Sequence, residues 1–143
     1  MENTSIINFT VYGEPQPWKR PRFNGKNKVV FEDPKVTVYK DKVITAYMES
    51  GGHKMFPKGV PLSCEVYFWL ALPSSASQKK KLDMACNGRP TKRPDNDNLY
   101  KGITDALNGI AYYDDSQIVD THIHKIWTMS TPRAEVEIRE IRR

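Results

Sequence analysis

Residues 62–72 (LSCEVYFWLAL) limit the possible folds of this chain more than any other segment. They are rich in aromatic and aliphatic side chains, and a proline followed by serines comes directly after them, as at the end of a strand. Toward the C-terminal end of the segment both faces are apolar, so we expect a central strand of a sheet. The longest apolar run, residues 66–72, is far shorter than the about 20 residues that cross a bilayer.

Three other segments alternate polar and apolar side chains as strands do. They are residues 5–12, 118–127 and 134–141, and a hairpin loop at 129–133 separates the last two. Residues 13–33 contain three prolines and two glycines, which predicts an irregular loop or a loose hairpin there.

Apolar residues at helical spacing predict two helices between these strands. Asp33-Pro34 suits the N-cap and first position of a helix that stops at Gly51-Gly52. A second helix, short and rich in lysine, is expected at residues 75–85.

The order of these elements predicts an α+β fold, with a mixed β-sheet of about four strands and helices packed on it. A length of 143 residues suits one domain, spanning residues 1–143. The two cysteines form no metal-ligand pair and no disulfide framework, and we expect no organic cofactor. The start of the chain lacks the basic and apolar stretches of a secretory signal, so we expect a cytoplasmic protein without a membrane segment.

A third helix, bounded by Pro94 and Gly109, carries the most chemical information. Asp95 suits its N-cap, and the glycine suits its end. With side chains placed at 100° per residue, one stripe of this helix is apolar and another is polar. The apolar stripe comprises Leu99, Ile103, Ala106 and Leu107. The polar stripe comprises Asp97, Asn98, Lys101 and Asp105.

Carboxylates stand at the start of this helix and again after its end in the sequence. Asp95 and Asp97 stand at its start, where the helix dipole stabilises negative charge. A chain returning to the strand at 118–127 can bring Asp115 beside them, and crowded carboxylates repel one another unless a cation shares them. Mg²⁺, which prefers oxygen ligands, suits such a site. The ordinary alternatives are a helix cap at Asp95 and a simple turn at Asp114-Asp115.

The net charge of +5 conceals a segregation of charge along the chain. Residues 19–28 sum to +5 and residues 79–94 to +5, whereas residues 95–120 sum to −5. Such basic stretches favour a polyanionic partner. The candidate phosphate contacts are Lys19, Arg20, Arg22, Lys92 and Arg93. The lysine run at 79–81 suits a solvated face equally well.

Three stretches resemble the RusA-type Holliday junction resolvases. They are Arg93-Pro-Asp-Asn-Asp-Asn-Leu-Tyr-Lys101, Asp105-Ala-Leu-Asn-Gly109 and Tyr113-Asp-Asp-Ser-Gln-Ile-Val119, and residues 13–23 carry a weaker likeness. The resemblance implies a RusA-like two-layer domain and a bacterial protein of host or phage origin. It also implies a homodimeric endonuclease that needs Mg²⁺, with Mn²⁺ as a substitute, and that resolves four-way DNA junctions by paired nicks.

The same resemblance assigns roles to individual residues. It implies catalysis by Asp95, Asp97, Lys101 and Asp115, with the three aspartates as metal ligands. It implies supporting roles for Asn98, Asp114 and Gln117. Two other functions stay open: a branched-DNA-binding module without catalysis, and a small metal-dependent nucleotide phosphohydrolase. The complete set of aspartates and lysine argues against the first, and the two basic stretches argue against the second.

Two further groups of residues have an ordinary interpretation. Trp18 and Phe23 lie in the basic N-terminal stretch, and ordinary aromatic burial favours packing beneath this loop over stacking on unpaired bases. Asp120, His122 and His124 share one face of a strand, which is a weak signal for zinc because no fourth ligand is nearby. We interpret them as surface or sheet-facing residues of the strand.

Overall fold

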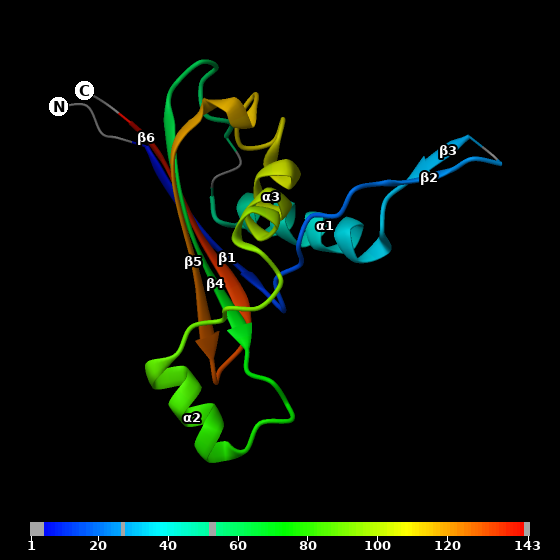
Figure 1. Cartoon of the computed structure of the whole chain (residues 1–143). Helices are drawn as coiled ribbons and strands as arrows, with labels where there is room; N and C mark the ends of the chain where they lie inside the picture. Colours follow the sequence, from blue (N-terminus) through cyan, green and yellow to red (C-terminus); the bar gives the residue numbers. More distant parts are fainter. Residues whose placement is uncertain (1–4, 27, 52–53, 142–143) are drawn as a thin grey trace.

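The computed structural model describes residues 5–26, 28–51 and 54–141, which form an open sheet with helices on one face (Figure 1). The sheet contains β1 (Ile6–Tyr12), β6 (Arg133–Glu140), β4 (Leu62–Ala71) and β5 (Ile118–Thr128), in that order. All four predicted strands are confirmed within one residue at each end. β4 runs parallel to β5 and antiparallel to β6, which makes the sheet mixed and confirms the α+β class.

β4 occupies an interior position in the sheet, as its sequence predicts. Only one of its faces is buried, the face formed by Leu62, Cys64, Val66, Phe68 and Leu70. The other face is half-buried because its side chains contact one another instead of a second layer of helices. The Trp69 indole, for example, donates a hydrogen bond to Glu135 of β6 (2.6 Å). The fold therefore has two layers, a sheet and the helices on its buried face.

α1 (Pro34–Glu49) begins as its sequence predicts, because Asp33 Oδ1 accepts a hydrogen bond from the N–H of Lys35 (2.8 Å). The helix ends just before Gly51, whose φ is +83°, and the other half of the predicted stop, Gly52, lies outside the described residues. Its buried side chains recur at helical spacing and join the core. They are Val36, Tyr39, Val43 and Tyr47.

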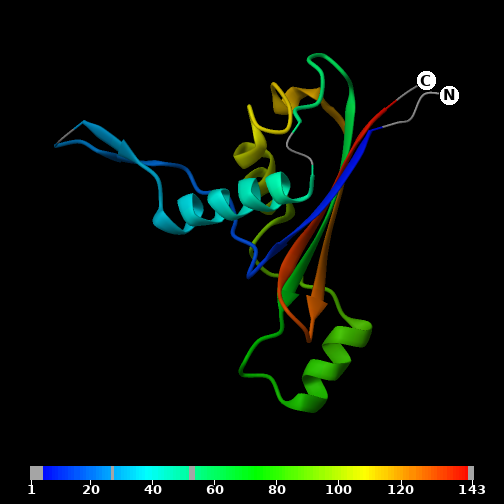
Figure 2. The same cartoon turned by 180° about the vertical axis from the view of Figure 1, so that it is seen from behind.

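α2 (Gln78–Asn87) begins three residues later than predicted. Ser77, and not an earlier serine, caps it by accepting a hydrogen bond from the N–H of Lys80 (3.2 Å). The helix buries no residue and lies beyond the end of the sheet (Figure 2). No helix in the described ranges is long and apolar enough to cross a membrane.

α3 (Asn96–Leu107) packs beside α1 on the buried face of the sheet (Figure 1). All four residues of its predicted apolar stripe are buried. Gly109 follows the helix with a φ of +75°, so the predicted helix end is confirmed. A short 3₁₀ helix, η1 (Asp115–Gln117), then leads into β5.

The N-terminal loop contains a hairpin, the second of its two predicted alternatives. β2 (Arg22–Asn24) and β3 (Val29–Phe31) pair antiparallel with each other and not with the main sheet. Both views show this hairpin extending away from the body of the molecule (Figures 1 and 2). We call residues 20–31 the hairpin arm.

Candidate functional site

The first turn of α3 carries two exposed aspartates. Asp95 occupies the N-cap position, but within the described part of the chain its carboxylate makes none of the hydrogen bonds by which an N-cap satisfies first-turn amides. Asp97 Oδ1 accepts a hydrogen bond from the N–H of Asn98 (2.9 Å). Capping therefore does not account for Asp95, and both carboxylates face solvent.

Asp115 lies at the opposite end of α3. Its N–H donates to Asn108 Oδ1 (2.9 Å), and its Oδ2 accepts from Asn108 Nδ2 (3.4 Å). Asn108 is the C-cap of the helix, and twelve helical residues rise by about 18 Å. The single chain thus does not bring Asp115 beside Asp95 and Asp97. Across residues 5–26, 28–51 and 54–141, no three His, Cys, Asp or Glu side chains are grouped to hold one metal ion.

A tight connection after α3 explains where Asp115 lies. The N–H of Gly109 donates to the carbonyl of Tyr112 (2.9 Å), and the Tyr112 hydroxyl donates to the carbonyl of Thr104 (2.6 Å). These bonds return the chain onto the last turns of the helix. Residue spacing alone does not reveal such a return, because it depends on the buried Tyr112.

Asp114 and Gln117 hold η1 in place. Asp114 Oδ2 accepts hydrogen bonds from the N–H and the hydroxyl of Ser116, and these bonds lower the pKa of Asp114. Gln117 Oε1 accepts from the N–H of Tyr113 (3.0 Å), while its Nε2 donates to the carbonyls of Pro57 and Val60 (3.0 Å each). The two side chains shape the turn that carries Asp115, which fits a supporting role.

Residues 14–18 cross directly over α3, and we call them the strap. The N–H of Trp18 donates to the carbonyl of Asn98 (2.8 Å). The Lys101 ammonium lies 3.8 Å from the centroid of the Trp18 ring, a cation–π contact. Gly102 permits this close approach, because a Cβ there would lie 2.8 Å from the carbonyl oxygen of Gln16.

The Trp18–Lys101 contact was not predicted from the sequence. The two residues lie far apart in the chain, and no periodic pattern connects a loop to a helix in this way. Trp18 is half-buried, so the packing alternative describes it correctly.

Basic side chains surround the start of α3. A pocket of about 490 Å³ lies between the strap and Asp95, and Lys19, Arg93 and Asn98 are among the residues that line it. The Lys125 ammonium of β5 donates to the carbonyls of Lys92 (2.9 Å) and Pro94 (2.8 Å), which holds the backbone just before Asp95.

The remaining predicted phosphate contacts lie in the N-terminal stretch. Arg20 and Arg22 are exposed on the hairpin arm. Lys19 forms an ion pair with Asp33 at the base of the arm (3.3 Å), so part of its charge is already balanced. Phe23 is 64% exposed, so packing beneath the loop is the wrong interpretation for this residue.

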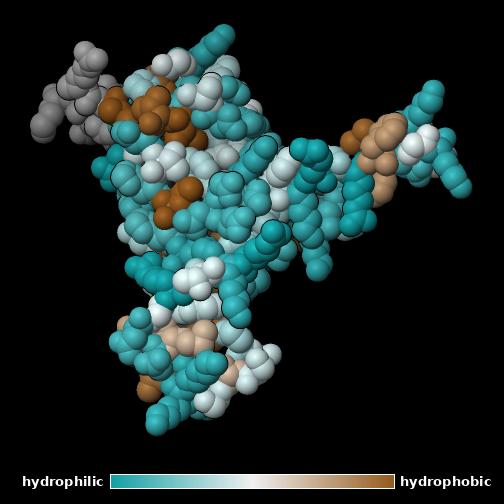
Figure 3. All heavy atoms as spheres, in the orientation of Figure 1, coloured by the Kyte–Doolittle hydropathy of each residue, from teal (hydrophilic) through white to brown (hydrophobic). Residues whose placement is uncertain are grey.

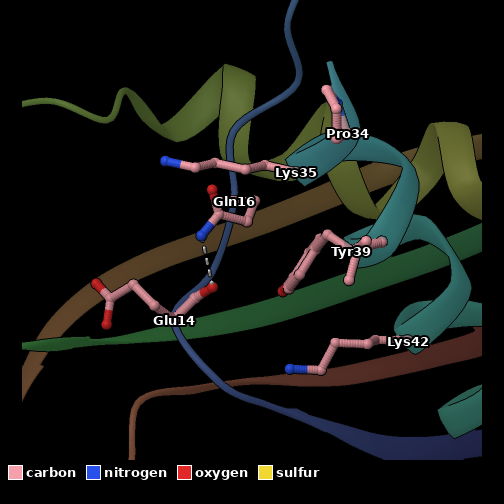
Figure 4. Close-up of a pocket in the computed structure, with 7 residues that line it drawn as sticks. Glu14, Gln16, Pro34, Lys35, Tyr39 and Lys42 are labelled. Atoms are coloured by element: carbon pink, nitrogen blue, oxygen red, sulfur yellow. Dashed lines mark hydrogen bonds between the residues drawn. The ribbon is translucent and has the colours of Figure 1, made fainter. Parts of the chain in front are cut away.

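A second pocket, of about 390 Å³, lies against α1 (Figure 4). Glu14 and Gln16 of the strap line both pockets. Figure 4 shows Lys35, Tyr39 and Lys42 entering this pocket from α1. Burial raises the pKa of Glu14. Burial also raises the pKa of Tyr39, and the negative charge of Glu14 adds to this effect.

His124 of β5 contacts other side chains on the half-buried face of the sheet, whereas His122 is exposed. His124 stacks on Tyr67 with ring centroids 4.2 Å apart, and its Nε2 lies 3.0 Å from Glu65 Oε2. These contacts agree with the interpretation of His124 as a sheet-facing residue.

Comparison with known sequences decides the family. The sequence profile described as endodeoxyribonuclease RusA matches residues 12–139, which include the strap, the arm, α3 and η1. This chain belongs to the RusA endodeoxyribonuclease family. A similar relative is "Uncharacterized protein YqaN" of Bacillus subtilis (strain 168), 41% identical over 139 residues, covering 94% of this chain and 96% of the relative.

A second similar protein, from Lactococcus phage r1t, carries the description "Crossover junction endodeoxyribonuclease rusA". It is 37% identical over 95 residues, which cover 66% of this chain and 66% of the phage protein. Membership of the RusA family confirms the resemblance seen in the motifs. Family membership supports a nuclease that acts on branched DNA.

Proposed function

We propose that this RusA-family protein is a Mg²⁺-dependent endodeoxyribonuclease that resolves four-way (Holliday) DNA junctions by paired symmetric nicks, in recombination and repair. Family membership supports the reaction class. The observation that carries the site is Asp95, which lies two residues before Asp97, is exposed and makes no capping bond within the part of the chain that the structure describes.

The donor set on α3 fits Mg²⁺. This ion binds proteins through one or two carboxylates and keeps several waters that exchange with substrate phosphates, so two exposed aspartates suffice. In this proposal Asp95 and Asp97 are the main ligands, and Mn²⁺ substitutes. Asp115 joins the set on the resemblance alone, because in the single chain it contacts Asn108. When bound, the ion activates a water and neutralises phosphoryl charge.

Lys101 is the proposed electrostatic catalyst. It stands one helical turn after Asp97 on the polar stripe of α3, and it is exposed with its ammonium against the Trp18 ring. A fixed positive charge there stabilises the negative charge that develops on a phosphoryl group under attack. In-line attack by water then yields a 5′-phosphate and a 3′-hydroxyl.

The basic residues are the proposed grip on the DNA backbone. Arg93 lines the pocket beside Asp95, and its neighbour Lys92 is exposed. Arg20 and Arg22 are exposed on the hairpin arm. Lys19 contributes less, because it is paired with Asp33. The similar phage protein supports an origin in a bacterium or its phage. Action in the cytoplasm is part of the proposal.

Cleavage of labelled DNA tests the reaction. We expect the protein to cut a four-way junction with Mg²⁺ and not with EDTA, and to leave a linear duplex of the same sequence largely intact. Junction binding without cutting would instead indicate a binding module. If the protein hydrolyses free nucleotides and leaves the junctions uncut, it is a phosphohydrolase.

Single substitutions test the residues. Asp95→Asn and Asp97→Asn are expected to lower cleavage at least 100-fold while junction binding persists, because the neutral amide cannot hold the cation. Asp41→Asn is the matched control, since Asp41 is also an exposed helical aspartate but lies on α1. Asp115→Asn decides whether the third aspartate belongs to the site: unchanged cleavage would remove it.

A further inference from the structure

The hairpin arm is anchored at its base. Lys19, just before the arm, forms an ion pair with Asp33, just after it (3.3 Å). Lys40 of α1 bridges Glu32, directly after β3 (2.7 Å), and Asp105 of α3 (3.1 Å). These bonds connect the arm to both helices, while β2 and β3 pair only with each other. The arm therefore has a held base and a projecting end.

The projecting end exposes apolar side chains. Phe23 and Val30 are cross-strand partners, so they share one face of the hairpin, and each is 64% exposed. Val29 and Phe31 are also exposed, on the opposite face. Figure 3 shows these apolar atoms among the hydrophilic surface of the arm. A two-stranded hairpin with adjacent apolar residues in water is marginal by itself, so such a surface is typical of a binding element.

The charge of the arm identifies its partner as nucleic acid. Residues 20–31 contain four Lys and Arg residues and no Asp or Glu. Phosphate groups attract such a stretch, whereas a second copy of the same arm would be repelled. Aromatic side chains bind nucleic acid by stacking on base faces, which a continuous duplex hides and a branch point exposes.

We propose that the hairpin arm recognises the branch point of the DNA substrate. Arg20 and Arg22 hold backbone phosphates, and the Phe23–Val30 pair stacks on the bases exposed at the crossover. The inference rests on the proposed function, and it states which feature of the DNA substrate the chain recognises. The arm begins two residues after Trp18, which contacts Lys101, so a short stretch of chain connects the arm to the surroundings of the proposed catalytic lysine.

Binding without cleavage isolates this step. We would measure the affinity of the full chain in EDTA for a four-way junction and for a linear duplex, by fluorescence anisotropy. Replacing both Phe23→Ser and Val30→Ser is expected to weaken junction binding about tenfold, the effect of losing one stacked base, and to leave duplex binding unchanged. The control is Val38→Ser, a valine on α1 with an exposed fraction of 60%, close to the 64% of Val30.

A second pair of substitutions separates stacking from charge. Arg20→Gln with Arg22→Gln is expected to weaken junction and duplex alike and to reduce the slope of log affinity against log salt. If the Phe23/Val30 variant loses affinity for the junction and for the duplex equally, the proposal is overturned. Loss of self-association in that variant, with junction binding unchanged, would also overturn it and indicate a dimer contact.

The two proposals fail separately. If the wild-type chain does not cut junctions but the Phe23/Val30 variant loses junction-selective binding, the proposed nuclease function fails and the role of the arm stands. If the wild type cuts junctions and the variant binds them normally, the role of the arm fails.

Discussion

Tyr39 and Tyr47 lie eight residues apart on α1, and their hydroxyls have different surroundings. The Tyr47 hydroxyl donates to the carbonyl of Lys54 (2.7 Å). The Tyr39 hydroxyl is buried and has no hydrogen-bond partner among the described residues. A buried polar group without a partner lowers stability, whereas a paired one contributes to it. The hydroxyls of these two tyrosines are thus expected to change the free energy of unfolding in opposite directions.

Tyr39→Phe is therefore expected to leave the free energy of unfolding unchanged or to raise it by up to about 1 kcal/mol. Tyr47→Phe, the matched control on the same helix, is expected to lower it by about 1 kcal/mol because it leaves a carbonyl without its partner. Urea unfolding followed by circular dichroism measures both. A clear loss of stability in Tyr39→Phe would contradict the unpaired state of its hydroxyl.

Trp18 provides a second prediction for a single residue. Trp18→Leu removes the ring beneath the Lys101 ammonium and is expected to slow single-turnover cleavage about fivefold, within the range of a cation–π contact, with little change in junction affinity. Trp18→Phe should retain most of the rate. Trp69→Leu is the control, because Trp69 of β4 makes a similar contact with Arg133 of β6, on the sheet and not on α3.

A double substitution shows whether Trp18 acts through the lysine. In a Lys101→Met background, Trp18→Leu is expected to slow cleavage no further, because the contact is already lost. If the reductions in cleavage rate are additive, Trp18 acts by holding its loop in place and not through Lys101.

At the scale of elements, Lys40 joins three parts of the structure. Its ammonium bridges Glu32 after the arm and Asp105 of α3. The hydrogen bond from Lys40 is the largest cause that lowers the pKa of Glu32, and the bond to Glu32 is the largest cause that raises the pKa of Lys40. The relative position of the arm and the helices therefore depends on charge.

This bridge predicts a dependence of stability on pH. The pKa of Glu32 in the folded state lies below its ordinary value of 4.5, so its stabilisation is complete above pH 4.5 and is lost as pH falls through the folded pKa. The pKa of Lys40 is raised above 10.5, so its contribution is complete below that pH and is lost as pH rises through the folded pKa.

Lys40→Met removes both effects, so the stabilities of wild type and variant should differ most at neutral pH and converge below pH 4.5. Urea unfolding at a series of pH values measures the difference. A constant difference across this range would contradict the role of the bridge.

At the scale of the whole molecule, two nicks on opposite strands need two active sites. Each chain carries one proposed site on α3, and a two-fold symmetric pair of chains supplies two in related positions. The proposed activity therefore predicts a homodimer of about twice the chain mass of 16.5 kDa. Light scattering that gives the mass of a single chain would contradict it.

Mixed dimers give a sharper test of the pair. A dimer with one wild-type and one Asp95→Asn subunit is expected to nick a plasmid-borne cruciform once, which produces an open circle, whereas the wild type produces a linear molecule. Gel electrophoresis distinguishes the two products. Linear product from the mixed dimer would show that one site makes both cuts.

Local patterns in the sequence were enough to predict most of the elements. Strand boundaries followed from alternation, and the ends of α3 followed from Pro94 and Gly109, because these signals act between neighbouring residues. α2 begins later than predicted because its capping residue, Ser77, lies inside the predicted segment. The motifs around Asp95 and Asp115 were also sufficient to indicate the RusA family, which the profile match confirms.

Only the tertiary structure decided how these parts meet. It placed Asp115 on Asn108 instead of beside Asp95, because the buried Tyr112 returns the chain onto α3. It also put Trp18 under Lys101 and left Phe23 exposed on the arm. Each of these outcomes depends on contacts between residues distant in the sequence, where packing and hydrogen bonding, and not local preference, select the arrangement.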